Sequence, residues 1–476
     1  MHMSENRQSS FRKCAILGDM DADVCYRALQ ARDARFDGLF FTAVRSTGVF
    51  CRPVCPARTP HRQNVEFFPN APAAQAAGYR PCLRCRPEVS PDLPVSAGTS
   101  TTVNRALRMI DEGALDSGST SQLAERLGLT DRHLRRLFLE HVGVPPVVVA
   151  GTRRVLFAKK LITETSLPFA DIAFAAGFSS LRRFNEAIHA TYQRNPKTLR
   201  RFAPPETDGQ SSIELRLQYR PPYDWTAFLN FVAPRAIPGL EIAAKGIYQR
   251  NGTTVQNNPA QNCLVVNIEG ANVTRLRQVV EQIRFFFDLR ANTREIADHL
   301  AKSPVMRHVV RKHPGLRLPG CWDPFELGVR AILGQQVTVK GASTLAGRLL
   351  EHCGSLAPES LAGANLTRVG LPKSRAESLR AFARAVSDGV LRFDSSITNE
   401  EIISRLCQLP GIGAWTANYI AMRALGDPDA FPSSDLGLLK ATGTTSPRRL
   451  EEIAEAWRPW RSYAALYLWE SLREKK

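Results

Sequence analysis

Four cysteines near the N-terminus are the residues whose types and spacing point most directly to chemistry. Cys51 and Cys55 are separated by three residues, and Cys82 and Cys85 by two. Four thiolates in two close pairs satisfy the tetrahedral coordination of zinc. The spacing alone leaves two hypotheses open: a zinc ribbon that only holds a small domain together, or a zinc-bound thiolate that reacts.

Arginines lie between and around these cysteines. Such a cluster suits a surface that faces phosphate, because guanidinium groups bind phosphate oxygens through paired hydrogen bonds. We expect Arg52 and Arg58 in particular to contact DNA. The full group is Arg52, Arg58, Arg80, Arg84 and Arg86.

Two glycines and an aspartate form a second candidate site in the C-terminal half. The segment "LPGIGAWTANYIAMRAL" puts Gly411 and Gly413 in a tight turn between two helices. Glycines there let backbone N–H groups at a helix N-terminus approach a DNA phosphate, although Pro-Gly turns join many helices without such a role. Further on, "DAFPSSDLGLLKA" places Asp435 just ahead of a helix, where its simplest role is an N-cap.

Composition favours a multidomain protein with a polyanionic partner. The 476 residues are enough for two to four domains, and 43% of them are apolar. The net charge of +18 favours nucleic acid as that partner. No apolar run approaches the ~18 residues of a membrane span, and Met1 to Arg12 lacks the apolar segment of a signal peptide. We therefore expect a cytoplasmic protein with no membrane partner.

Two polar stretches rich in proline, residues 86–101 and 203–212, are predicted to be linkers. Between them lies a degenerate repeat, "TSQLAERLGLTDRHLRRLF" and "FADIAFAAGFSSLRRFNEAI". Each copy has a short helix, a glycine, an N-capping hydroxyl residue (Thr130 or Ser179) and a second helix that carries arginines. This pattern predicts two helix-turn-helix motifs.

The C-terminal half begins with a small predicted α+β unit. "IELRLQY" alternates apolar and polar residues, as a half-buried strand does, and "CLVVNIEG" is a second strand. "TRLRQVVEQIRFFFDL" places its apolar residues on one face of a helix. From Arg290 onward the pattern predicts helices almost exclusively.

The four-cysteine segment, "FFTAVRSTGVFCRPVCPARTPHRQNVEFFPNAPAAQAAGYRPCLRCRPE", closely resembles the N-terminal domain of the Ada family of bacterial adaptive-response proteins. The resemblance implies one zinc ion bound by Cys51, Cys55, Cys82 and Cys85. It also implies that Cys51 irreversibly accepts the methyl group of a DNA methylphosphotriester. Zinc would keep the thiol deprotonated at neutral pH and therefore nucleophilic.

Residues 101–202 resemble the AraC/XylS-type DNA-binding domain. In that family the second helix of each motif enters the major groove of DNA. The resemblance implies sequence-specific binding to a promoter or operator, with RNA polymerase as a further partner. Each arginine could instead be part of a solvated helix face. The candidate DNA contacts are Arg132, Arg135, Arg182 and Arg183.

The glycine turn and the downstream aspartate together resemble the helix-hairpin-helix glycosylases, most closely the inducible 3-methyladenine DNA glycosylases of bacteria. The resemblance makes Asp435 the catalytic carboxylate, which stabilises the cationic sugar as the glycosidic bond breaks. Bifunctional members carry a Schiff-base lysine where this chain has Trp415. We therefore expect a monofunctional enzyme, and the four-cysteine iron–sulfur loop of some relatives is absent from this region.

Three aromatic residues are candidates for the pocket that receives the damaged base. Trp415 and Tyr419 share a helical face, and Trp469 matches a pocket aromatic of the family. Alkylated purines are cationic and stack well on such rings, although plain core packing is the alternative for Tyr419 and Trp469. The intercalating leucine of the family is replaced by Gln336, which departs from the pattern because the residue is polar.

These inferences predict a multidomain chain in four parts. They are a small α+β zinc methyl-acceptor domain (1–92), an all-α tandem helix-turn-helix domain (101–202), an α+β subdomain (213–288) and an all-α helix-hairpin-helix glycosylase domain (289–476). The expected function is repair of alkylated double-stranded DNA, coupled to transcription regulation at the nucleoid. The alternative is a methylation-activated regulator whose glycosylase half is weak or inactive.

Overall fold

The computed structural model describes residues 21–91, 101–200, 212–394 and 396–473. The chain forms two compact units: residues 1–220 with 270–281, and residues 221–269 with 282–476. The multidomain class predicted from the sequence is confirmed. No helix of the described residues is long and apolar enough to cross a membrane.

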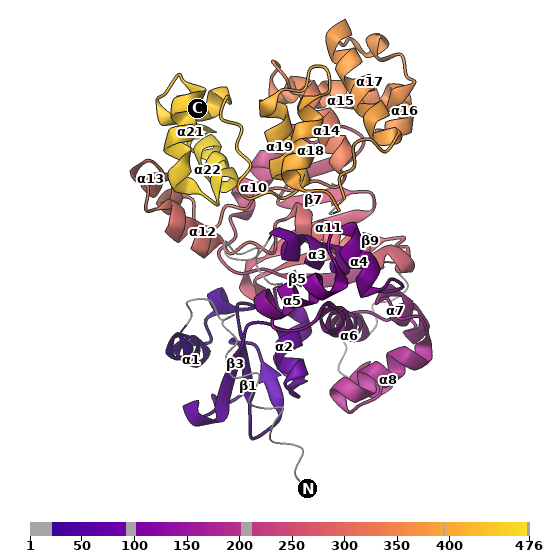
Figure 1. Ribbon diagram of the computed structural model, residues 1–476, viewed down its shortest axis with the longest axis vertical. Coiled ribbons are helices and arrows are strands. Elements are labelled where there is room, and N and C mark those ends of the chain that lie inside the picture. The colour runs from indigo at the N-terminus through magenta and orange to yellow at the C-terminus, as the bar shows by residue number, and fades with distance from the viewer. Residues whose placement is uncertain (1–20, 92–100, 201–211, 395, 474–476) are drawn as a thin grey trace. The chain divides into compact units, whose positions relative to one another are not determined.

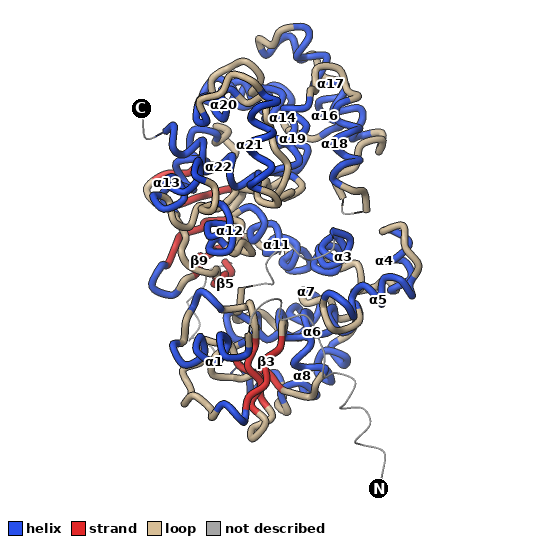
Figure 2. The backbone as a smooth tube through the Cα atoms, turned by 60° about the vertical axis from the view of Figure 1, so that its left-hand side comes forward, coloured by secondary structure: helices blue, strands red, loops and turns tan. Residues whose placement is uncertain are grey.

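The first unit opens with a small mixed domain. Its four-stranded sheet has the order β3-β1-β2-β4, in which β1 pairs antiparallel with β2 and β3, and β4 pairs parallel with β2. Figures 1 and 2 show the strands together, with α1 beside them. The elements are α1 (Ala22–Ala31), η1 (Ala34–Phe36), β1 (Phe41–Val44), β2 (Val49–Cys51), η2 (Arg62–Asn64), β3 (Val65–Phe68), α2 (Ala71–Ala76), β4 (Arg80–Pro81) and η3 (Pro87–Val89).

A helical domain follows and contains both predicted helix-turn-helix motifs. The second helix of the first motif begins where Thr130 accepts a hydrogen bond from the His133 N–H. In the second motif the capping residue is Ser180 and not the predicted Ser179, because the helix begins one residue later. The elements are α3 (Thr101–Asp111), α4 (Thr120–Arg126), α5 (Asp131–His141), α6 (Pro146–Glu164), α7 (Phe169–Ala175), α8 (Leu181–Tyr192) and α9 (Pro196–Arg200).

The start of the first predicted linker is ordered structure. Residues 86–91 contain η3, and Glu88 is buried among charged partners. Charged residues in a proline-rich segment are typical of a solvated linker, so the sequence did not predict that Glu88 is buried. Residues 92–100 and most of the second linker lie outside the described residues.

The strands and the helix predicted after the second linker are confirmed as β5 (Ser212–Gln218), β9 (Cys263–Glu269) and α11 (Leu276–Phe286). The first unit also contains β5 and η6 (Val273–Arg275). The sheet of the second unit has consecutive antiparallel strands in the order β6-β7-β8-β9. Its other early elements are α10 (Trp225–Val232), η4 (Ala233–Arg235), β6 (Glu241–Ala244), β7 (Ile247–Arg250), β8 (Thr253–Asn258) and η5 (Pro259–Gln261).

From Arg290 onward the described residues form helices and loops, as predicted. The buried helix α14 packs against α19, and α20 packs against α22. These elements are α12 (Thr293–Leu300), α13 (Pro304–Lys312), α14 (Pro324–Leu333), α15 (Val339–Cys353), α16 (Pro358–Ala362), η7 (Leu366–Val369), α17 (Lys373–Ser387), α18 (Asn399–Cys407), α19 (Ala414–Ala424), α20 (Leu436–Thr442), α21 (Pro447–Ala454), η8 (Glu455–Trp457) and α22 (Arg461–Arg473).

Candidate functional sites

The four predicted zinc ligands lie together at one end of the small sheet. Cys51 is the last residue of β2, and the parallel strand β4 leads directly into the turn that carries Cys82 and Cys85. All four Sγ atoms lie within 4.8 Å of one another. Zinc–sulfur bonds of about 2.3 Å in a tetrahedron require sulfur atoms about 3.8 Å apart. The arrangement therefore fits a single tetrahedral zinc ion.

A backbone N–H group donates to one of these sulfurs. The N–H of Arg52 donates to the Sγ of Cys85 at 3.3 Å. An N–H donor withdraws charge from a thiolate, so this bond makes the sulfur of Cys85 less nucleophilic.

Arg52 is held inside the zinc domain. Its Nε lies 2.9 Å from Oδ1 of Asp37, and one of its terminal nitrogens donates to the Cys85 carbonyl at 3.1 Å. The Arg52 side chain is 11% exposed and that of Asp37 is 6% exposed. The geometry thus gives Arg52 a role in holding the cysteine loop, and its role in DNA contact stays a prediction. Arg58 is exposed, as a DNA contact must be.

One buried and one partly exposed ion pair join the zinc domain to α6 of the helical domain. Arg86, which follows the last cysteine, lies 2.8 Å from the Glu164 carboxylate. The carboxylate of Glu88 lies 3.2 Å from the Lys159 ammonium. The Glu164 side chain is 8% exposed, that of Glu88 1%, and that of Lys159 5%. The zinc centre is therefore fixed relative to the helix between the two helix-turn-helix motifs.

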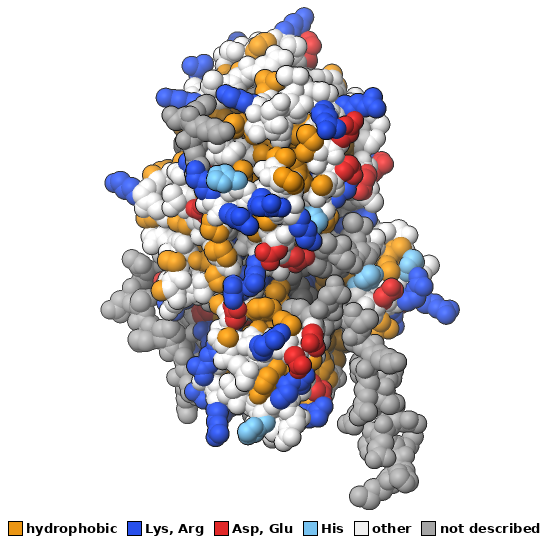
Figure 3. Space-filling view, turned by 90° about the vertical axis from the view of Figure 1, so that its left-hand side faces the viewer, with side chains coloured by type: hydrophobic (Ala, Val, Ile, Leu, Met, Phe, Trp, Pro, Cys, Tyr) orange, Lys and Arg blue, Asp and Glu red, His pale blue; other side chains and the backbone are white. Residues whose placement is uncertain are grey.

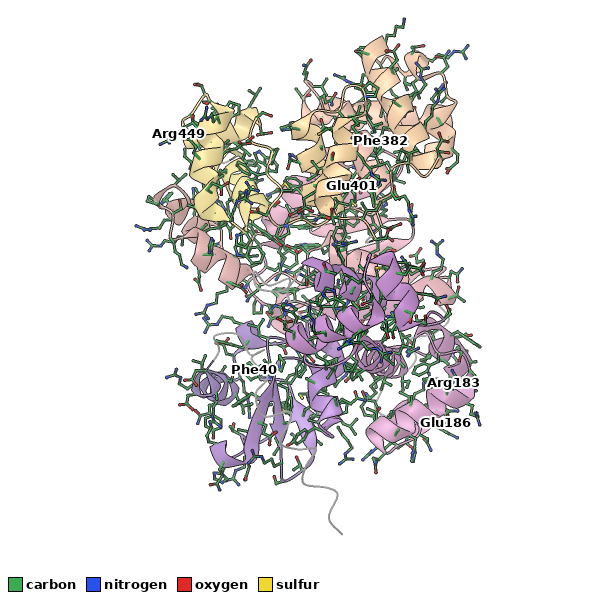
Figure 4. All side chains as sticks on the ribbon, viewed as in Figure 1. Phe40, Arg183, Glu186, Phe382, Glu401 and Arg449 are labelled. Carbon is green, nitrogen blue, oxygen red and sulfur yellow. The ribbon has the colours of Figure 1, made fainter. Side chains whose placement is uncertain are left out.

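The four candidate arginines of those motifs lie on the second helix of each. Arg132 and Arg135 are exposed on α5, and Arg182 and Arg183 are exposed on α8. Arg135 forms an ion pair with Asp131 at 2.9 Å. Arg183 and Glu186 project outward from α8 (Figure 4). All four arginines can reach a partner, and which of them contact DNA stays a prediction.

Charge on the surface does not by itself single out one DNA-binding face. Lys and Arg side chains are spread over the face in Figure 3, with Asp and Glu side chains among them. The sites are therefore better identified from local geometry than from the net charge.

In the second unit, Asp435 is both an N-cap and the centre of a hydrogen-bonded group. Its Oδ1 accepts the N–H of Leu438 at 3.0 Å, which caps α20. The same Oδ1 accepts the indole N–H of Trp469 at 2.9 Å, and Oδ2 accepts that of Trp415 at 3.0 Å. The capping role and the proposed catalytic role therefore belong to one carboxylate.

The three predicted aromatic residues form a group beside this carboxylate. The rings of Trp415 and Tyr419 stack with centroids 5.4 Å apart and planes 8° apart. The Trp469 ring lies 6.2 Å from that of Tyr419 at an angle of 55°. None of the three is fully buried, so they retain surface that a base could cover. Whether these three residues line a base pocket or only pack together stays a prediction.

Two arginines that sequence reasoning missed lie against Tyr419. Arg423 donates to the phenol oxygen at 2.9 Å, and Arg235 at the end of η4 also interacts with it. Burial raises the pKa of Tyr419, but the two guanidinium groups outweigh it, so the pKa is lowered overall. The i, i+4 spacing of Tyr419 and Arg423 on α19 was the one available sequence signal.

The glycine turn lies between α18 and α19, as predicted. Gly411 has φ +76°, and a Cβ there would lie 2.1 Å from Oγ of Ser378, so only glycine fits. A Cβ on Gly413 would meet nothing within 4 Å. This open space in front of the N-terminus of α19 lets a phosphate approach the backbone.

Gln336 lies on an exposed turn next to this hairpin. Its neighbour Gln335 donates to the Gly411 carbonyl at 2.9 Å and to the Thr416 hydroxyl at 3.0 Å. Gln336 itself is exposed and has φ +56°. These two hydrogen bonds join the turn to the hairpin. Sequence reasoning missed this role of Gln335. Whether Gln336 enters DNA stays a prediction.

Comparisons with known proteins place these sites in a family. Family models match the metal binding domain of Ada at residues 24–88, a helix-turn-helix domain at 123–201 and the AlkA N-terminal domain at 214–323. Two Mycobacterium tuberculosis proteins named "Probable bifunctional transcriptional activator/DNA repair enzyme AlkA" are each 41% identical over 95% of this chain and 97% of their own length. The chain belongs to this activator and repair enzyme family.

Two Escherichia coli proteins are similar to separate parts of this family member. DNA-3-methyladenine glycosylase 2 is 34% identical over 53% of this chain and 95% of its own length. The bifunctional transcriptional activator/DNA repair enzyme Ada is 40% identical over 28% of this chain and 36% of its own length. The Ada metal-binding match contains all four cysteines of the cluster.

Proposed function

We propose that this protein excises alkylated purines of the 3-methyladenine type from double-stranded DNA and accepts methyl groups on Cys51 from DNA methylphosphotriesters. Methylated protein then binds a promoter or operator and activates transcription with RNA polymerase, in the cytoplasm and at the nucleoid. The observation that carries the excision proposal is the Asp435 carboxylate, held by Trp415 and Trp469 beside a stack of aromatic rings.

The chain's own residues supply each part of excision. The hairpin around Gly413 receives a phosphate, and the aromatic group receives the extruded base by stacking. The Asp435 carboxylate stabilises the positive charge that develops on the sugar as the bond to the base breaks. Water then completes the hydrolysis, since Trp415 stands where a Schiff-base lysine would be needed.

Methyl transfer uses a different atom, the Sγ of Cys51. A bond forms between this sulfur and the methyl carbon, the bond from that carbon to the phosphotriester oxygen breaks, and a phosphodiester anion leaves. When zinc is bound at the four cysteines, it keeps the thiols deprotonated at neutral pH. Cys51 is the sulfur proposed to react because it is the first of the four cysteines, which is the methyl-acceptor position of the Ada family that this segment resembles. The other three cysteines remain as ligands.

The excision proposal is tested by base release from methylated DNA, with wild type beside Asp435→Asn. Asparagine is also a good N-cap, so the variant keeps α20 and loses the negative charge. We expect the rate of 3-methyladenine release to fall by about 100-fold or more while duplex binding is retained. Release at the wild-type rate would show that Asp435 acts only as a helix cap. No release by the wild type would favour the alternative of a regulator with an inactive glycosylase half.

Methyl transfer is tested separately, with DNA that carries methylphosphotriesters. Mass spectrometry of peptides should place one added methyl group on Cys51, and the Cys51→Ser variant should gain none. Zinc analysis of both proteins serves as the control that the site is still loaded. A methyl group on Cys55, Cys82 or Cys85 would contradict the assignment.

A further inference from the structure

Leu436 is an apolar side chain left in solvent at the edge of the excision site. It is the first residue of α20 and is 82% exposed, the highest value among the large exposed hydrophobic residues that the structure describes. The next most exposed, Val390, is 62% exposed. Leu438 and Leu439 form the buried face of α20, so Leu436 makes no contribution to that face.

Both chain neighbours of Leu436 belong to the site. Asp435 precedes it and holds the two indole N–H groups. Gly437 follows it and lies against Trp469, since a Cβ on Gly437 would be 3.2 Å from Cδ1 of that indole. A single exposed leucine on a protein surface is ordinary. An exposed leucine between two residues of the site requires a further explanation.

The chemistry of excision supplies an explanation for the exposed leucine. A sugar stabilised by Asp435 must bring its C1′ within a few ångströms of the carboxylate. Consecutive Cα atoms are about 3.8 Å apart, so a nucleotide at Asp435 also lies over Leu436. Because Leu436 points to solvent and not into the helix packing, its side chain is accessible to such a nucleotide.

We propose that Leu436 is a substrate-contacting residue that packs against the sugar of the extruded nucleotide. It supplies an apolar contact to DNA on this side of the site, whereas the exposed residue of the turn beside the hairpin, Gln336, is polar. Burial of the leucine side chain by DNA stabilises the complex with the extruded nucleotide. This inference rests on the proposed excision activity, because it requires a nucleotide at Asp435.

The experiment compares Leu436→Ala with Leu436→Met and with the matched control Val390→Ala. Val390 is also an exposed apolar residue, but it lies beyond α17 and away from Asp435 in sequence. One readout is kcat/KM for base release from a duplex that contains one lesion. The other is affinity for a duplex that contains a tetrahydrofuran abasic-site analogue, which needs no catalysis. Thermal melting checks that all three variants fold.

We expect Leu436→Ala to lower kcat/KM and the affinity for the tetrahydrofuran duplex about tenfold or more. Leu436→Met should retain most of the wild-type kcat/KM and affinity, and Val390→Ala should change neither value. Equal affinity of wild type and Leu436→Ala for the tetrahydrofuran duplex would overturn the inference. If wild type binds that duplex through Leu436 but releases no base, the excision proposal fails and the contact stands.

Discussion

The indole N–H of Trp469 donates to Oδ1 of Asp435 at 2.9 Å, across a separation of 34 residues in the chain. Trp415 donates to the other carboxylate oxygen at 3.0 Å. With the N–H of Leu438 as a third donor, the carboxylate is fixed in position. The rings of the same two tryptophans both lie next to that of Tyr419, in the proposed base pocket. Each tryptophan therefore positions the charged group as well as contributing an aromatic face.

The first prediction separates these two contributions of Trp469. Trp469→Phe keeps an aromatic face but removes the N–H donor to a charged acceptor, a hydrogen bond worth about 1.5–3 kcal/mol. We expect kcat for base release to fall about tenfold or more, with little change in affinity for lesion DNA. Trp225→Phe is the matched control, since that indole donates to the Gly246 carbonyl in the same unit. A larger effect on KM than on kcat would mean that stacking is the main role.

The second prediction concerns the glycine after the exposed leucine. In Gly437→Ala the new Cβ would lie 2.9 Å from Oδ1 of Asp435 and 3.2 Å from Cδ1 of Trp469. Alanine is otherwise a better helix residue than glycine, which offsets part of the strain from these close approaches. We expect base release to fall at least tenfold because the carboxylate and the indole must move apart. Gly151→Ala on α6, whose Cβ would meet nothing within 4 Å, is the matched control and should leave base release unchanged. Full activity of Gly437→Ala would show that the pair tolerates displacement.

Patterns local in sequence predicted much of this fold. Capping residues and glycines located the helix-turn-helix motifs, alternation located β5 and β9, and one apolar face located α11. The cysteine spacing predicted the cluster itself. Apart from the two cysteine pairs, each of these signals lies within one element or one turn, where residues close in sequence are also in contact.

Contacts between distant residues were not predictable in the same way. Nothing near Arg86 marks Glu164 as its partner, and nothing near Tyr419 marks Arg235. The assignment of Arg52 to DNA followed from its neighbourhood in sequence, whereas its buried ion pair with Asp37 depends on how the loop folds back. Tertiary packing decides which charged groups are paired, and one sequence does not show it.

The third prediction concerns strand chemistry. Position 415 is a tryptophan whose N–H donates to Asp435, and an indole nitrogen does not form a Schiff base. The product of excision should therefore be an intact abasic strand. Borohydride added during reaction with a lesion duplex should trap no covalent adduct, and a bifunctional glycosylase that carries the lysine serves as the positive control. A trapped protein–DNA species would show that another amine attacks the sugar.

The fourth prediction concerns pH and the link between the zinc domain and α6. Burial raises the pKa of Glu164, but Lys160 and Arg86 outweigh it, so the pKa lies below the usual 4.5. A lowered carboxyl pKa stabilises the fold above pH 4.5, and this contribution is lost as the pH falls below that value. Glu164→Gln should therefore lower the free energy of unfolding by about 2 kcal/mol at pH 7.

The difference between wild type and Glu164→Gln should shrink as the pH falls below 4.5. Melting curves recorded for zinc-loaded protein at several pH values measure it. Glu140→Gln, a change at an exposed position on α5, is the control for loss of one carboxylate. Loss of zinc in acid affects all three proteins, so only differences between them are compared. A difference that is constant with pH would exclude the ion pair as its source.

The fifth prediction concerns the methylation switch. A zinc ion with four thiolates has a formal charge of about −2, and methylation of Cys51 makes one ligand a neutral thioether, which leaves about −1. The surface must face phosphates, because the methyl donor is itself a phosphotriester. Removal of one negative charge about 10 Å from a phosphate relieves about 0.4 kcal/mol in water and about 1.7 kcal/mol at an effective dielectric constant near 20.

The effects of several phosphates add together. The ion pairs of Arg86 and Glu88 hold the zinc domain against α6. The reduced repulsion therefore acts on the DNA that the helix-turn-helix motifs bind. We expect methylation to strengthen operator binding about tenfold or more at low salt, and the gain to shrink as salt rises. Titration of methylated and unmethylated protein against one operator at two salt concentrations measures both effects. Cys51→Ser protein exposed to the same methyl donor should show no gain. Equal affinities of methylated and unmethylated wild type at low salt would exclude an electrostatic switch, whereas a gain independent of salt would require a conformational one.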